Sequence, residues 1–171
     1  GVQIGMTVGL LENTILYCIA HVKTAPVMSL IADESMAKLR MSQFVMPMLV
    51  ASGFDHLLQS PEGAQGARTS GKPQDKISFE GGGTLYTFGA NSPAKLSSFP
   101  VKYLLIDEPD RYKASLKLNG DPIALAIGRT KSYAQSRKIC LLSTPTIEGQ
   151  SKIHDHYTAG DQRKYFVPCK H

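Results

Sequence analysis

The sequence contains no apolar run near the roughly 18 residues that a membrane-spanning helix requires, and it shows no secretory signal. We therefore expect no membrane partner. The longest apolar segment, ILYCIAHV, is interrupted by polar residues and is typical of a buried helix. Cysteine is scarce, and Cys18, Cys140 and Cys169 are far apart, in or beside apolar segments. This spacing excludes a disulfide framework and favours the reduced core thiols of a cytosolic protein.

Other features of known enzymes and binding proteins are also missing. No Ser-His-Asp or Cys-His grouping has a useful spacing, and there is no internal repeat. Aromatic residues, at 8%, are not interleaved with the basic residues as in a protein that binds single-stranded nucleic acid. The net charge of +5 is compatible with a nucleic-acid partner or with a solvated basic face. Basic residues become more frequent towards the C-terminus: Arg137, Lys138, Lys152, Arg163, Lys164 and Lys170.

The composition that is present fits one globular domain. The 171 residues are 42% hydrophobic and 19% charged, which is ordinary for a protein with a substantial core. The chain opens on GVQIGMTVG, which has the composition of a loop, and stops at FVPCKH without a closing signal. We interpret residues 1–171 as one domain of a longer protein.

Apolar periodicity and turn residues predict strands that alternate with helices. Helices are expected over residues 7–23, 33–52, 91–99, 121–135 and 149–158. Strands are expected over residues 27–32, 76–80, 84–90, 101–107, 138–144 and 164–169. Asp33 is a good N-cap for the helix over residues 33–52, and Pro47 is expected to kink or end that helix. Residues 60–75 read as a loop, and the glycines Gly81–Gly83 favour a hairpin over a phosphate loop. The order predicts an α/β fold, with a mainly parallel sheet flanked by helices and a β-hairpin insertion.

The segment VKYLLIDEPDRY, residues 101–112, reads as a buried strand that ends in two carboxylates, Asp107 and Glu108. Open α/β sheets bind ligands beyond the carboxyl ends of their strands. A nucleotide hydrolase needs one carboxylate to hold magnesium and another to orient the attacking water. Neighbouring residues of a strand point to opposite sides, so this pair can serve both needs. The alternative is a charged turn that only caps the strand.

Two further segments carry the same indication. QIGMT precedes a helix, whose N-terminus offers N–H groups and a positive dipole to an anion. In the pattern G-x-x-x-x-G-K-[ST], Gly5 and Thr7 take the last Gly and the hydroxyl positions, and Met6 replaces the lysine. The strand KICLLSTPT ends in Ser143 and Thr144, which are placed to sense a terminal phosphate. The order of the three segments favours an ATPase of the RecA-like kind.

Four segments together resemble the large terminase subunit of lambda-like tailed phages: GANSPAKLSSFPVKYLLIDEPDRY, GDPIALAIGRT, LLSTPTIEGQSKIHDHY and DQRKYFVPC. This family is a DNA-packaging motor with an N-terminal ATPase domain and a C-terminal nuclease domain. The resemblance implies a RecA-like P-loop ATPase fold, ATP and Mg²⁺ as cofactors, and packaging of double-stranded DNA into a procapsid in the host cytoplasm. The partners that it implies are double-stranded DNA, the small terminase subunit, the portal protein and further copies of the chain in a ring.

The resemblance also implies roles for the N-terminal residues. The family's deviant phosphate loop has its lysine at the start of the loop, which here would lie just before Gly1. Its remnant would comprise Gln3, Ile4, Gly5, Met6 and Thr7. Thr7 would share the magnesium ion with Asp107.

Further roles follow in the C-terminal half. Glu108 would be the catalytic carboxylate, and Ser143 and Thr144 would belong to the motif that couples hydrolysis to movement. Arg129, in GRT, would supply positive charge to the transition state. Where relatives carry LRSRP, this chain has LSSFP at residues 96–100.

Several alternatives stay open on the sequence. A helicase-like ATPase would share the same core, and a non-catalytic module with a degenerate phosphate loop would use its basic surface to bind DNA or a partner. His154, Asp155 and His156 suggest a metal site, although residues two apart on a helix face away from each other. Cys169 and His171 would belong to a zinc site only if further ligands followed.

Overall fold

The sheet at the centre of the molecule is mainly parallel. The computed structural model describes residues 5–59, 75–116, 120–164 and 166. In this part of the chain the strand order is β2-β3-β1-β4-β5. β1 pairs in parallel with β3 and β4, β4 pairs in parallel with β5, and only β2 is antiparallel to its neighbour. The strands are β1 (Pro26–Ile31), β2 (Lys76–Ser78), β3 (Thr84–Gly89), β4 (Tyr103–Asp107) and β5 (Lys138–Leu142). The predicted α/β fold with a hairpin is therefore confirmed.

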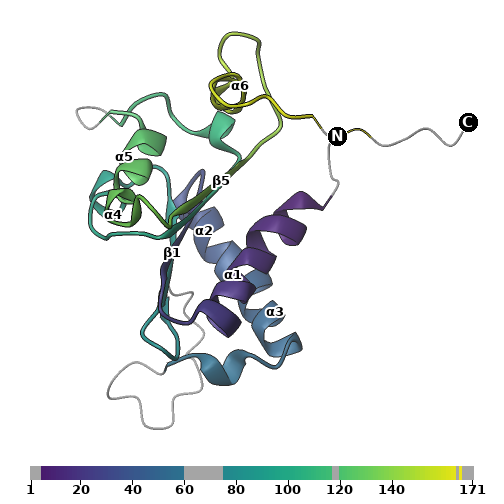
Figure 1. Cartoon of the computed structure of the whole chain (residues 1–171), viewed down its shortest axis with the longest axis vertical. Coiled ribbons are helices and arrows are strands. Elements are labelled where there is room, and N and C mark those ends of the chain that lie inside the picture. The colour runs from purple at the N-terminus through teal and green to yellow at the C-terminus, as the bar shows by residue number, and fades with distance from the viewer. Residues whose placement is uncertain (1–4, 60–74, 117–119, 165, 167–171) are drawn as a thin grey trace, which may run out of the picture.

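Two helical runs cover one face of the sheet (Figure 1). The first is continuous from Thr7 to Val22, with α1 (Asn13–Tyr17) between the π-helical segments η1 (Thr7–Glu12) and η2 (Cys18–Val22). The second comprises α2 (Glu34–Arg40), the π-helical η3 (Met41–Val45) and α3 (Met46–Ala51). Their apolar side chains pack with one set of strand residues, among them Val27, Leu85 and Leu105.

The opposite face of the sheet is covered by α4 (Pro93–Leu96) and α5 (Pro122–Gly128), and α6 (Lys152–Thr158) lies beyond the end of β5 (Figure 1). The strand residues on this face alternate with those on the first, as the two-residue period of a strand requires. Met28, Leu104 and Ile106 pack here with Leu96, Ile123 and Ala126 of the two helices. Burial on both faces explains why β1 and β4 read as unbroken apolar runs.

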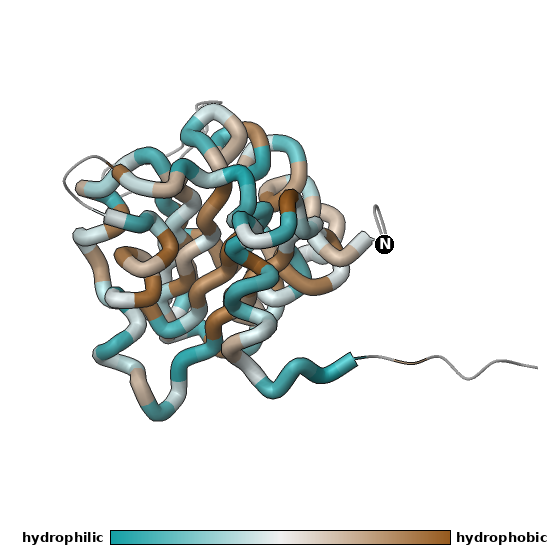
Figure 2. Tube along the Cα trace, turned by 90° about the horizontal axis from the view of Figure 1, so that it is seen from above, coloured by the Kyte–Doolittle hydropathy of each residue, from teal (hydrophilic) through white to brown (hydrophobic). Residues whose placement is uncertain are grey.

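The apolar residues gather along the sheet and the inner faces of the helices, and the polar residues lie on the outside (Figure 2). Cys18 is fully buried in this core and Cys140 is half-buried, both as free thiols. Burial raises the pKa of the Cys18 thiol to about 11. Both thiols are thus structural core residues, as the sequence indicated; Cys169 lies outside the described residues.

Local signals in the sequence explain the helix boundaries. Asp33 caps α2, because its Oδ1 accepts a hydrogen bond from the Met36 backbone N–H at 2.9 Å. Pro47 does not end the second run, which passes from π- to α-helical hydrogen bonding at Met46 and continues to Ala51. Pro47 lies inside this continuous run, where it has no N–H to donate, just after the π-helical segment η3.

Three predicted boundaries were wrong. The helix expected over residues 121–135 ends at Gly128, a poor helix former, and a short 3₁₀ turn at Lys131–Tyr133 follows. The strand expected to reach Thr144 ends at Leu142, the partner of the last residue of β4. The helix expected from residue 149 begins at Lys152, because Ser151 is its N-cap. The strand expected over residues 164–169 lies largely outside the described residues.

Candidate active site

The carboxyl ends of the four parallel strands meet at one edge of the sheet, and this edge brings together four of the predicted residues: Asp107, Glu108, Ser143 and Thr144. Asp107 is the last residue of β4 and pairs with Leu142, the last residue of β5. The backbone N–H of Glu108 donates to the Leu142 carbonyl at 2.7 Å. Ser143 and Thr144 follow Leu142 directly and so lie beside the two carboxylates. This is the position at which open α/β sheets bind ligands.

Glu108 has a backbone conformation that side chains other than glycine rarely adopt. Its φ and ψ are 54° and 51°, in the left-handed region, at the start of the short helix η5 (Pro109–Arg111). The side chain is 36% exposed and lies 3.5 Å from the Arg111 Nε. Such strain costs on the order of 1–3 kcal/mol and is concentrated at active sites. The turn thus presents an accessible carboxylate beyond the end of a buried strand.

Asp107 is buried, with 4% of the residue exposed. Its Oδ2 forms an ion pair with the guanidinium of Arg40, the last residue of α2. Its Oδ1 is buried and has no hydrogen-bond partner in the described part of the chain. A buried carboxylate oxygen left without a donor is suited to a hard cation or to a water that the cation holds. Asp107 therefore fits the magnesium ion that the sequence predicted.

A third charged side chain lies beside this pair. Glu12, on η1, is 4% exposed. Burial raises the pKa of the Glu12 carboxyl; the positive charge of Arg40 opposes this effect and the negative charge of Asp107 adds to it. The helix that begins at Thr7 therefore carries a carboxyl to the end of β4, next to the ion pair. The sequence analysis did not identify Glu12 or Arg40.

Tyr112 fixes the turn that follows Glu108. Its hydroxyl donates to the carbonyl of Leu30 at 2.7 Å or to that of Asp107 at 2.9 Å, so it bridges β1 and β4 at their carboxyl ends. The ring is buried. Burial, with the negative charge of Asp107 adding to it, raises the pKa of the Tyr112 hydroxyl, which stays a hydrogen-bond donor. The backbone of Asp107 is thus held in place at the end of its strand.

The predicted phosphate loop lies only partly within the described residues. Gln3 and Ile4 are outside them. Gly5 has φ of +73°, which suits a tight turn before a helix, and Met6 is 40% exposed. Thr7 is the first residue of η1, and this helix contacts β4. The helix that starts at Thr7 therefore runs beside the strand that ends at Asp107.

The two hydroxyl residues after β5 differ in exposure. Ser143 is half-buried and its hydroxyl donates to the Thr144 carbonyl at 3.2 Å, whereas Thr144 is exposed. Neither side chain is committed to the core, so both are available at the sheet edge. Their role near a phosphate stays a prediction.

Arg129 is not brought to this edge. Its carbonyl accepts from the Val101 N–H at 3.0 Å, and its Nη1 donates to the Ser97 carbonyl at 3.1 Å. Val101 precedes Asp107 by the whole length of β4, roughly 20 Å at about 3.3 Å per residue. Within one chain, Arg129 therefore lies at the amino end of β4, away from Asp107 and Glu108.

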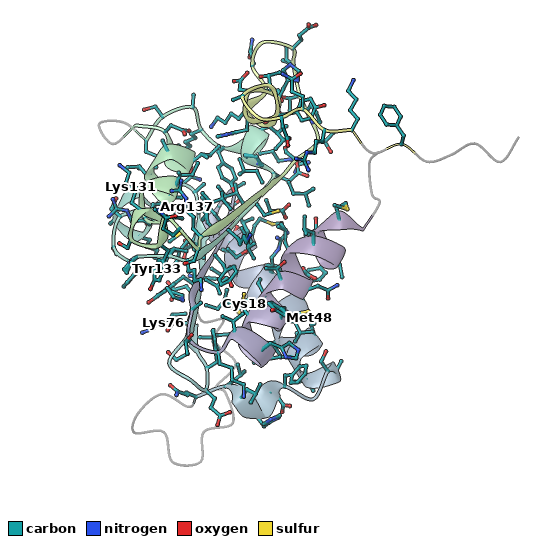
Figure 3. The ribbon with its side chains drawn as sticks, in the orientation of Figure 1. Cys18, Met48, Lys76, Lys131, Tyr133 and Arg137 are labelled. Atoms are coloured by element: carbon teal, nitrogen blue, oxygen red, sulfur yellow. The ribbon has the colours of Figure 1, made fainter. Side chains whose placement is uncertain are left out.

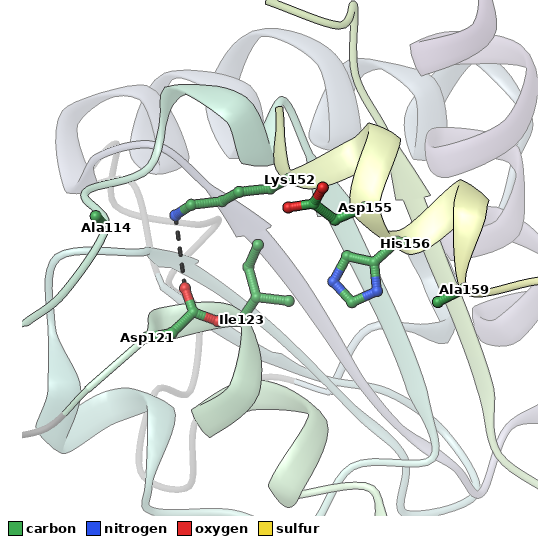
Figure 4. A pocket seen from close by; sticks show the side chains of 7 residues that line it. All are labelled: Ala114, Asp121, Ile123, Lys152, Asp155, His156 and Ala159. Carbon is green, nitrogen blue, oxygen red and sulfur yellow. Dashed lines mark hydrogen bonds and ion pairs between the residues drawn. The ribbon is translucent and has the colours of Figure 1, made fainter. Parts of the chain in front are cut away.

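The alternative metal site is not supported either. In the described part of the chain no group of three or more His, Cys, Asp and Glu side chains is arranged to hold a metal ion. Asp155 and His156 border a shallow hollow of about 460 Å³ between α5 and α6, across from the ion pair of Lys152 with Asp121 (Figure 4). Cys169 and His171 lie outside the described residues.

Two basic side chains and a tyrosine lie in the segment before β5, which begins at Lys138. Lys131, Tyr133 and Arg137 gather beside α4 and α5, away from the first helical run (Figure 3). Lys131 is exposed and the Arg137 guanidinium donates to the Thr130 hydroxyl at 3.0 Å.

Among the described residues no helix has the length and apolar character to cross a membrane.

A parallel sheet with helices on both faces, with two carboxylates and two hydroxyl residues at its carboxyl edge, is the arrangement of a nucleotide-hydrolysing α/β domain. A family model for the ATPase domain of the phage terminase large subunit gpA matches residues 1–171. The chain belongs to this family. No curated protein gives a significant sequence match.

Solved structures of large terminases share the fold. The large terminase of bacteriophage HK97 superposes with a TM-score of 0.67 at 12% identity, over 92% of this chain and 31% of that one. The large terminase of a thermophilic bacteriophage, in complex with ADP, gives a TM-score of 0.59 at 12% identity, over 85% and 32% of the two chains. The chain thus spans about a third of the length of these proteins.

Of the two charged residues that the sequence analysis missed, Glu12 left a signal in the sequence and Arg40 did not. Glu12 interrupts the buried side of a helix, between Leu11 and Ile15, and a charged residue in that position calls for a partner. Arg40 lies inside the amphipathic helix predicted over residues 33–52 and looks like any cation on its polar face. Its pairing with Asp107 joins residues 67 positions apart, which no local pattern predicts.

Proposed function

We propose that this chain hydrolyses Mg-ATP as the motor domain of a terminase large subunit that packages double-stranded DNA into a procapsid. The observation that carries the proposal is the edge formed by β4 and β5. A strained, accessible Glu108 lies there beside the buried Asp107, and the hydroxyl residues Ser143 and Thr144 follow the neighbouring strand.

Each residue has a distinct task in this proposal. Glu108 orients the attacking water and accepts its proton, because it is the carboxylate that solvent reaches. The free Oδ1 of Asp107 and the hydroxyl of Thr7 would hold magnesium. When bound, the metal ion offsets the negative charge of the phosphates. Gly5 and Met6, with Gln3 and Ile4 before them, would supply backbone N–H groups to those phosphates.

Ser143 and Thr144 would hydrogen-bond the terminal phosphate and respond to its loss. Arg129 is left out of the active centre of its own chain because it lies at the other end of β4. In a ring of identical chains it would be free to act on a neighbour. The proposed partners are double-stranded DNA, the small terminase subunit, the portal protein and other copies of the chain, in the host cytoplasm.

One observation favours a second candidate, a non-catalytic module that binds DNA or a partner. Met6 takes the place of a lysine, and Arg40 already neutralises Asp107. A domain that never binds magnesium would keep such an ion pair permanently. The basic side chains near Lys131 and Arg137 would then be its binding surface.

The test compares ATP turnover of the full-length protein with that of its Glu108→Gln variant. Glutamine keeps the size of the side chain but accepts no proton. We expect turnover to fall at least about 100-fold, which is roughly 2.7 kcal/mol in barrier, with ATP binding retained. Glu80→Gln is the matched control, because Glu80 is an exposed carboxylate whose ion pair with Lys23 lies in the hairpin region, away from the sheet edge.

If the unmodified protein neither binds nor hydrolyses ATP, the binding module is the correct function. If Glu108→Gln hydrolyses ATP as fast as Glu80→Gln, Asp107 and Glu108 only cap a strand. A loss confined to the Glu108 variant supports the motor.

A further inference from the structure

Asp110, two residues after Glu108, binds the segment that follows β5. Its Oδ2 accepts hydrogen bonds from the backbone N–H of Thr146 at 3.0 Å and from the hydroxyl of Thr146 at 3.1 Å. Its Oδ1 accepts from the backbone N–H of Ile153, in the first turn of α6, at 2.9 Å. One carboxylate therefore holds both ends of the connection between Ser143–Thr144 and α6.

These bonds are strong enough to keep the carboxylate charged. Burial opposes its ionisation, but hydrogen bonds from Ser151, Ile153 and Thr146 outweigh burial and lower the pKa of the Asp110 carboxyl. Hydrogen bonds to an ionised acceptor are about twice as strong as neutral ones. The attachment of α6 to the turn at Pro109–Arg111 is thus a charged one.

A second contact reinforces the attachment. The Nζ of Lys152, the first residue of α6, lies 3.2 Å from the Tyr112 carbonyl and 2.9 Å from the Lys113 carbonyl. Tyr112 is itself bonded to the Asp107 carbonyl. A continuous set of polar contacts therefore leads from the end of β4 through the turn to α6.

The rest of the surroundings hold α6 loosely. A hollow lies between α5 and α6, and the ion pair of Lys152 with Asp121, the N-cap of α5, at 3.5 Å links the two helices across it (Figure 4). Within the described residues, no side chain of α6 is buried, and the element that α6 contacts most is the turn at Pro109–Arg111. The position of α6 is thus set by the turn rather than by a core of its own.

We propose that Asp110 is the positioning residue that couples the turn bearing Glu108 to α6, so that a change of the turn moves Thr146 and the helix together. The idea rests on the proposed function in that the turn carries the residue that meets ATP. It goes beyond that function because it identifies Asp110 as the link between the turn and α6, and α6 as the element that moves. An aspartate is needed because donors contact both of its carboxylate oxygens: the N–H and hydroxyl of Thr146 contact Oδ2, and the N–H of Ile153 contacts Oδ1. An asparagine would have to point its NH₂ group at one of them.

The test is amide hydrogen exchange over residues 107–113 and residues 143–158, with and without a perturbation of the turn. Two perturbations are used: a non-hydrolysable Mg-ATP analogue, and Glu108→Gly, which relaxes the turn without any ligand. Each is applied to the unmodified protein, to Asp110→Asn and to Thr146→Val, which removes the hydroxyl donor but keeps the backbone N–H. Asp155→Asn, an exposed carboxylate on α6 itself, is the matched control.

In the unmodified protein and in Asp155→Asn, we expect each perturbation to change exchange rates in α6 at least about threefold. In Asp110→Asn, the changes in exchange rate should stay within residues 107–113. In Thr146→Val, the response of α6 to each perturbation should be partly lost. If α6 responds to the perturbations equally in the unmodified protein and in Asp110→Asn, the coupling is wrong. A residue that only stabilised α6 would change the exchange rate of α6 without a perturbation, but not its response. If the analogue changes no segment, the proposed function fails, whereas Glu108→Gly still decides the coupling.

Discussion

Arg40, at the end of α2, and Asp107, at the end of β4, form a buried ion pair across the carboxyl edge of the sheet. The side chain of Arg40 is 15% exposed and that of Asp107 is 5% exposed. The pair leaves one oxygen of Asp107 free and places a cation between two buried carboxyls, those of Asp107 and Glu12. Arg40 thus stabilises a negatively charged edge in the absence of any ligand.

Removal of Arg40 should therefore destabilise the fold strongly. Arg40→Gln leaves Asp107 charged, buried and unpaired, which costs about 3–5 kcal/mol. Urea unfolding measures the loss. Arg111→Gln is the matched control, because the ion pair of Arg111 with Glu108 has side-chain exposures of 73% and 36% and should contribute less than about 1 kcal/mol. If the two substitutions lowered the free energy of unfolding equally, the buried pair would contribute no more to stability than the exposed one.

Glu108→Gly should separate stability from function. Glycine adopts the left-handed conformation at no steric cost, so the substitution relieves strain and we expect a gain of about 1 kcal/mol in the free energy of unfolding. ATP turnover should be lost at the same time. Glu80→Gly, at an exposed position without a positive φ, should instead lose about 0.5–1 kcal/mol. A lower free energy of unfolding in Glu108→Gly would contradict the inference that the backbone of Glu108 is strained.

The acid sensitivity of the fold should depend on Lys95. The Lys95 ammonium lies 2.6 Å from carboxylates of both Glu34 and Asp75. Its hydrogen bond lowers the pKa of the Asp75 carboxyl from the ordinary 3.8. A carboxyl whose pKa falls on folding stabilises the fold above its unfolded pKa, and this contribution disappears as the pH falls through the lower folded pKa.

Lys95→Met should remove this part of the acid response. Thermal unfolding from about pH 6 to about pH 3 should show a smaller loss of stability for Lys95→Met than for the unmodified protein. The effect is small, below about 1 kcal/mol, because the three side chains are at least a third exposed. Lys131→Met, at an exposed lysine, should keep the normal profile. Identical profiles for all three proteins would rule out the contribution.

Sequence reasoning works best where one local rule decides the outcome. Apolar runs buried on both faces identified β1 and β4, Asp33 identified the start of α2, and Gly81–Gly83 identified the hairpin. It failed where two rules compete. The helix predicted over residues 121–135 ends at Gly128, and the Arg129 carbonyl accepts from the Val101 N–H of a distant segment.

The same contrast holds for the site. By itself the sequence determined that one buried strand ends in two carboxylates and that another ends in two hydroxyl residues, because strand ends and chain order are local properties, whereas the pairing of these two strands is a property of the sheet. Only the tertiary structure decided that Arg40 neutralises Asp107, that Asp110 holds α6, and that Arg129 lies at the far end of β4. These relationships join residues distant along the chain, and their energies depend on burial and on the direction of hydrogen bonds, which exist only once the sheet and helices have packed.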